Sequence, residues 1–144
     1  LGYPDSKTAV KLLMDSATRA RASLVSPIIT GDSIVAMAKL ATEVHVDEAV
    51  MQYLSDIVEG TRTHRDVVLG VSMRGAMALA RAVKSWAISQ GRTFVTPDDV
   101  RELAPYVLAH RMVLDPDAEF AGAKASDIVA RILVDIEPPA YRAA

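Results

Sequence analysis

The sequence contains no cysteine, and this absence removes two kinds of site. Without thiols the chain can form neither a disulfide bond nor a cysteine-ligated zinc site, which is compatible with a reducing cytosol. Aromatic residues are also scarce, at 5% of 144 residues, although 51% of the chain is apolar. Ala, Val, Leu, Ile and Met must therefore fill the interior, as suits closely packed helices.

Neither sign of charge dominates the chain. It carries 16 basic and 18 acidic residues, for a net charge of −2, and the basic residues are spread along it. A nucleic-acid module is usually basic on one face, so we expect no nucleic-acid partner. No apolar run reaches the roughly 18 residues of a membrane span, and no signal peptide is visible. We therefore expect a cytoplasmic protein without a membrane span.

The length predicts a single domain over residues 1–144. The chain opens on Leu1-Gly2-Tyr3 without an initiator methionine, so we expect it to be a fragment of a longer protein. No repeat of fixed period and no low-complexity stretch interrupts it.

The motifs of common enzyme classes are missing. No G-x-x-x-x-G-K-[ST] segment could cradle a triphosphate, and no G-x-S-x-G segment could present a serine nucleophile. His45, His64 and His110 lie far apart, so we expect no metal site. Asp98-Asp99 resembles a catalytic carboxylate pair, but adjacent helical residues point about 100° apart, and capping explains them better. The chain alone is expected to be inactive.

Apolar residues recur at helical spacing in about six segments and predict a mainly α fold with short extended segments. Helix starts are expected at residues 4–6, 30–33, 47, 72, 96 and 126. The first helix should run to Arg19 and Arg21, Gly91 should end the fourth, and Pro105 should interrupt the fifth. Extended segments are expected at 44–46, 67–69 and 112–114, a polar loop at 61–66 and a turn at 115–117.

Residues 69–75 combine several features of an anion site. Ser72 is a plausible N-cap, which puts Arg74 in the first helical turn beside free backbone N–H groups that favour a phosphate. Gly75 leaves the backbone open to close approach, and Arg81, seven residues on, shares nearly the same face. The helix dipole disfavours a cation there by some tenths of a kcal/mol. From the residues alone, a solvated surface arginine is the simpler interpretation and a phosphate contact is the alternative.

Several segments in a fixed order resemble the lid domain of MoxR-type AAA+ ATPases. They cover nearly the whole chain: Leu1-Gly2-Tyr3-Pro4, residues 46–50, Tyr53, Val58, Thr61-Arg62, residues 69–74, residues 91–100, Leu103-Ala104-Pro105 and residues 107–111. The resemblance implies a lid-type bundle of about six helices. Such a lid closes over ATP and Mg²⁺ that a separate P-loop core holds.

The same resemblance implies a role for Arg74. Gly70-Val71-Ser72-Met73-Arg74 matches the family's sensor-2 motif, with Met73 where the family usually has proline. Arg74 would then touch the γ-phosphate, with Ser72 and Gly75 as further candidate nucleotide contacts. In this branch an inserted helix displaces the lid, and residues 32–42 are the candidate. The nucleotide of its own subunit and that of a neighbour therefore both stay open as the target of Arg74.

The resemblance also implies a parent protein that hydrolyses ATP. Its lid would contact its own core and neighbouring subunits in a hexameric ring, and the complex would remodel or mature other proteins, often with a von Willebrand factor A-type partner. The alternative is a stand-alone helical protein-interaction or DNA-binding regulatory module. The helices after Ser72 or Thr96 would form a helix-turn-helix in that case, but the acidic balance is against it.

Overall fold

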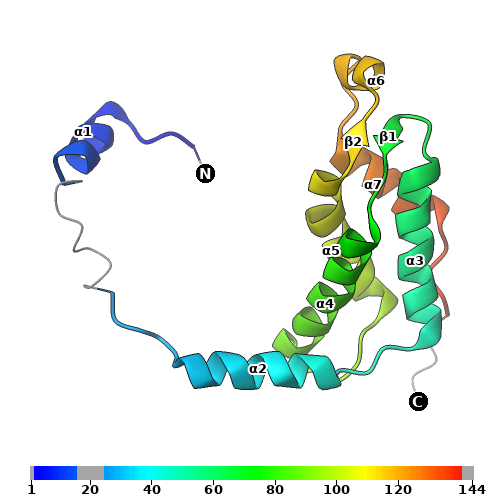
Figure 1. Ribbon diagram of the computed structural model, residues 1–144, viewed down its shortest axis with the longest axis horizontal. Helices are drawn as coiled ribbons and strands as arrows, with labels where there is room; N and C mark the ends of the chain where they lie inside the picture. Colours follow the sequence, from blue (N-terminus) through cyan, green and yellow to red (C-terminus); the bar gives the residue numbers. More distant parts are fainter. Residues whose placement is uncertain (1, 16–24, 141–144) are drawn as a thin grey trace. The chain divides into compact units, whose positions relative to one another are not determined.

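The computed structural model describes residues 2–15 and 25–140, which divide into two units, Leu1–Ile34 and Val35–Ala144 (Figure 1). In the first unit, α1 (Ser6–Asp15) begins after Asp5, whose carboxylate accepts the Thr8 N–H at 2.7 Å. The expected extension of this helix to Arg19 and Arg21 lies outside the described residues.

The second unit holds most of the secondary structure. After α2 (Gly31–Glu43), which crosses the unit boundary, come α3 (Glu48–Thr63), β1 (Val67–Leu69), α4 (Met73–Ser89), α5 (Pro97–Leu108), the 3₁₀ helix η2 (Ala109–Arg111), β2 (Val113–Leu114), α6 (Pro116–Phe120) and α7 (Ala125–Asp135). Helix α4 packs along α5, while α7 packs against α3 and α5. The prediction of a mainly α fold is confirmed, with seven α-helices in the described ranges rather than about six.

Aliphatic side chains form the core of the second unit. Ile57, Leu79 and Leu108 are fully buried and come from α3, α4 and α5. Tyr53 is the one aromatic residue among the described core residues. The low aromatic content therefore corresponds to helices packed through branched aliphatic side chains.

Two short pairings join the connections between the helices. Strands β1 and β2 run antiparallel, with Val67 opposite Leu114, at the end of the bundle that also carries α6 (Figure 1). His45 and Phe94 form an isolated parallel bridge, supported by the bond from the His45 N–H to the Thr93 carbonyl at 2.9 Å. All three expected extended segments therefore contain paired backbone.

Two sequence expectations about helix length were wrong. Residues 61–66 were expected to be a loop, but α3 continues to Thr63 because Thr61 is buried and its hydroxyl donates to the Val58 carbonyl at 2.6 Å. Pro105 was expected to interrupt its helix, but α5 continues to Leu108. A proline removes the hydrogen bond that its own N–H would donate and crowds the carbonyl four residues back, but it leaves its own carbonyl able to accept. The Pro105 carbonyl still accepts the Ala109 N–H.

Two helix starts also differ from expectation. Helix α7 begins at Ala125 with Lys124 at the N-cap and no side-chain cap, while the Ser126 hydroxyl bonds to Asp127 at 3.3 Å. The expected turn at 115–117 opens the short helix α6, because the Asp115 carboxylate accepts the N–H groups of two following residues. Within the described ranges, no helix is both long enough and apolar enough to cross a bilayer.

Candidate functional site

Arg74 lies in the first turn of α4. Ser72 is the N-cap, with extended backbone, and its hydroxyl accepts the Gly75 N–H at 3.4 Å. Both predictions about this helix start, the Ser72 cap and the first-turn position of Arg74, are confirmed. The Arg74 side chain is exposed, and no other residue in the described part of the chain pairs with its guanidinium. The site therefore presents a free cation at a helix N-terminus.

The residue before the cap, Val71, is fixed to the end of α3 through both of its backbone polar groups. Its N–H donates to the Thr61 hydroxyl at 2.9 Å, and its carbonyl accepts the Arg62 Nε–H at 2.9 Å. Thr61 and Val71 are both fully buried. We call these three residues, Thr61, Arg62 and Val71, the clamp. Its Thr61–Val71 bond is buried and therefore costly to break, and the partly buried Arg62 bond adds to it, so that the clamp fixes the start of α4 against α3.

Two glycines allow the close approach that the clamp requires. A Cβ atom at Gly70 would lie 2.6 Å from the Arg62 Cα, which is backbone and cannot move aside cheaply. A Cβ atom at Gly75 would lie 2.5 Å from Val71 Cγ1 and 3.2 Å from Arg111 Cδ. The close approach at Gly75 is thus made by side chains of the same chain.

Sequence reasoning assigned no role to Thr61 and Arg62. A signal was present, because Val50, Leu54 and Ile57 form a helical stripe that reaches Thr61 when continued by four residues. A threonine on the buried side of a helix needs a hydrogen-bond partner, and the N–H of Val71 supplies one.

Asp99 has a structural role at the start of α5. Its side chain is 4% exposed, completes a capping box with Thr96, and pairs with both terminal nitrogens of Arg92 at 2.5 and 2.7 Å. Burial raises the pKa of Asp99, but the hydrogen bonds from Arg92 and Thr96 outweigh it, so that the pKa lies below its ordinary value. The prediction that capping explains the acidic pair is confirmed for Asp99.

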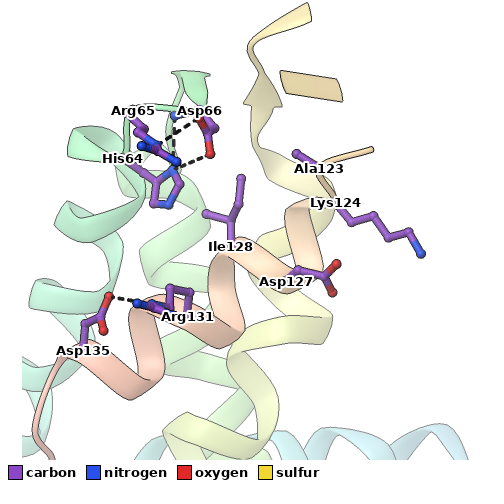
Figure 2. Close-up of a pocket in the computed structure, with 9 residues that line it drawn as sticks. All are labelled: His64, Arg65, Asp66, Ala123, Lys124, Asp127, Ile128, Arg131 and Asp135. Carbon is purple, nitrogen blue, oxygen red and sulfur yellow. Dashed lines mark hydrogen bonds and ion pairs between the residues drawn. The ribbon is translucent and has the colours of Figure 1, made fainter. Parts of the chain in front are cut away.

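A polar hollow of about 680 Å³ lies between the α3–β1 turn and α7 (Figure 2). Its charges largely pair with one another: Arg65 contacts Asp66 at 3.4 Å, and Arg131 contacts Asp135 at 3.4 Å. Ser72, Arg74 and Gly75 do not line it. The hollow therefore does not bring the predicted site residues together. As a separate point, no group of His, Asp and Glu side chains among the described residues could hold a metal ion.

Comparisons with known proteins identify the family. A model of the AAA lid domain matches residues 59–132, about half of the chain. The uncharacterized protein YeaC of Bacillus subtilis (strain 168) is 34% identical over 144 residues, which is 100% of this chain and 45% of that protein. Chaperone MoxR1 of Mycobacterium tuberculosis is 30% identical over 123 residues, covering 79% of this chain and 32% of that protein.

A solved structure extends the likeness to the fold. A candidate ATPase from Cytophaga hutchinsonii superposes with a TM-score of 0.77 at 23% identity, covering 97% of this chain and 45% of that chain. The chain thus spans less than half the length of these relatives. The helical fold, the family match and the relatives agree with the resemblance seen in the sequence. The chain belongs to the AAA lid domain family, and MoxR proteins are among its relatives.

Proposed function

We propose that this lid supplies Arg74 as the sensor-2 arginine of an ATPase whose P-loop core lies elsewhere in the full-length protein. The observation that carries the proposal is the exposed Arg74 guanidinium, which no other described residue pairs, on a helix start that the clamp fixes in place. A cation held in this way can meet a γ-phosphate through charge-assisted hydrogen bonds, about twice as strong as neutral ones. Contact with ATP would then couple the nucleotide state to the lid angle.

The chain's own residues fit a contributing role and not a complete nucleotide site. ATP and Mg²⁺ would be bound mainly by the core, which would supply the charge neutralisation of phosphoryl transfer. The geometry of a helix start leaves first-turn N–H groups without intrahelical acceptors, and Ser72 satisfies that of Gly75. We therefore propose that Ser72 and Gly75 support the nucleotide contact by shaping the turn, while Arg74 makes it.

The relatives support a wider proposal for the full-length protein. Because one relative is described as a chaperone, we propose chaperone-like remodelling or maturation of protein complexes by a cytoplasmic, hexameric ATPase. The lid would contact its own core and neighbouring subunits, and a von Willebrand factor A-type protein would be a partner. Residues 1–144 would serve as one lid, with α2 (Gly31–Glu43) as the inserted helix that decides whose nucleotide Arg74 reaches.

The test is ATP hydrolysis by the full-length protein. Arg74→Ala should lower turnover about tenfold or more, because a charge contact made in the transition state is lost. Arg131→Ala, which removes an exposed arginine of α7, is the control and should leave turnover within about twofold of wild type. Equal ATP turnover in wild type and Arg74→Ala would contradict the proposed sensor-2 role of Arg74. The 144-residue chain alone should hydrolyse no ATP.

A further inference from the structure

Two adjoining hollows follow α4 in the second unit. One, of about 630 Å³, lies among α2, α3 and α4, and the other, of about 230 Å³, lies between α3 and α4. Both are lined by Met51, Met77 and Ala80, so they form one continuous surface, which we call the methionine groove. Met73 extends the groove toward the start of α4.

The floor of the methionine groove is apolar and adaptable. Met73 and Met77 are 63% and 49% exposed, although both side chains are apolar and one helical turn apart. Methionine is flexible and polarizable, and it recurs on surfaces that accept partner helices. Ala38, Ala41 and Ala80 leave room for a close approach beside these methionines. The groove therefore suits the apolar face of an amphipathic helix.

The charge at the rim of the groove has one sign. Arg62, Arg81 and Lys84 are the charged lining residues of the two hollows, and no carboxylate lines either of them. Helix α4 itself carries three cations and no acidic residue.

The three rim cations, Arg62, Arg81 and Lys84, differ in how far they are already paired. Arg62 contacts Glu59 at 3.0 Å, and Lys84 donates to the Thr42 carbonyl at a long 3.4 Å. Arg81 is exposed, and its guanidinium has no partner in the described part of the chain. An approaching carboxylate would therefore be attracted, and a cation repelled.

We propose that the methionine groove binds an amphipathic helix of a partner protein that carries glutamate or aspartate along the flanks of its apolar face. The apolar face would cover Met73 and Met77, and the acidic flank would meet Arg81 and Lys84. The single sign of the rim favours an acidic segment, and the concave floor between helices favours a helix over a flat bilayer surface. This inference does not depend on the nucleotide role of Arg74.

The test uses the full-length protein and two synthetic helical peptides of about 18 residues. Both peptides carry leucine at i, i+3, i+4 and i+7, and their flanks carry either glutamate or lysine. Fluorescence anisotropy should show that the glutamate peptide binds at least tenfold more tightly at low salt. The preference should shrink as salt is added, because the rim charges are exposed to solvent.

Reversing the charge of a rim residue tests whether the peptide binds at the methionine groove. Arg81→Glu should abolish or invert the preference, while Lys124→Glu makes the same change in charge at an exposed residue that lines neither hollow and should keep it. Equal binding of both peptides, no binding of either, or an unchanged preference in Arg81→Glu would overturn the proposal. Binding by the 144-residue chain but not by the full-length protein would show that the protein covers its own groove. If the protein bound neither peptide but sedimented together with anionic phosphatidylglycerol vesicles, the groove would be assigned to a membrane surface. Either of these last two results would also overturn the proposal.

Discussion

The Thr61 hydroxyl accepts the N–H of Val71 at 2.9 Å while it donates to the Val58 carbonyl at 2.6 Å. The buried Thr61 side chain thereby hydrogen-bonds both to a carbonyl of its own helix, α3, and to an N–H of the segment that leads into α4. The start of α4, which carries Arg74, is therefore connected to the end of α3 by a hydrogen bond that is buried away from water.

Thr61→Val should lower the free energy of unfolding by about 1–3 kcal/mol. Valine has nearly the same shape, so the loss comes from leaving the buried Val71 N–H without an acceptor. Urea denaturation followed by circular dichroism measures the change. Thr63→Val, at an exposed position of the same helix, is the control and should cost less than about 0.5 kcal/mol. Equal effects of the two substitutions would contradict the importance of the Val71 bond.

Gly70→Ala should destabilise the domain by about 1–3 kcal/mol, because the added methyl group would meet the Arg62 backbone at 2.6 Å. Gly31→Ala is a matched control, since a Cβ atom there meets nothing within 4 Å. Thermal unfolding of both variants beside wild type would show the difference as separate midpoints. A Gly70→Ala protein as stable as Gly31→Ala would show that the turn can relax without cost.

Asp99→Asn should destabilise the domain by about 1–3 kcal/mol at pH 7, because it replaces the buried carboxylate of the capping box and of the Arg92 pair with a neutral amide. The folded-state pKa of Asp99 lies below its ordinary value of 3.8. Its contribution is therefore fully present well above pH 3.8 and is lost as the pH falls through the folded-state pKa. Urea denaturation at pH 7, 5, 4 and 3 should show wild type and variant converging at the acid end. A difference independent of pH would assign the effect to packing.

Arg74→Ala should leave the free energy of unfolding within about 0.5 kcal/mol of wild type. Its side chain is exposed and pairs with no other described residue, and the helix dipole does not favour a cation in the first turn. Chemical denaturation of the variant beside wild type checks this. A large loss of stability would mean that any fall in ATP hydrolysis reflects misfolding.

Local patterns predicted most of the helix boundaries. Asp47, Ser72 and Thr96 cap their helices as expected, and Gly91 ends α4 with a φ of +72°. These signals are local because a cap requires only a side chain and the N–H groups two or three residues on.

Signals that depend on packing were missed. The continuation of α3 through Thr61 depends on burial against a segment ten residues away, which the polar sequence there obscures. The start of α7 at Ala125 lacks a capping side chain, so no residue type marks it. For the candidate site, the position of Arg74 followed from the Ser72 cap. The clamp and the methionine groove depend on how helices meet, which one sequence does not encode in a readable pattern.

A Cβ atom at Gly75 would meet the side chains of Val71 and Arg111, and the Nε–H of Arg111 donates to the Val107 carbonyl in α5 at 2.9 Å. The beginning of α4 therefore packs closely against the segment that leads into it and against η2, the 3₁₀ helix that follows α5. A force applied at Arg74 would act on α3 through the clamp and on α5 through Arg111, because closely packed interfaces shift as units and do not deform continuously. The three helices would then rotate as one rigid body, about a hinge that lies outside α3, α4 and α5.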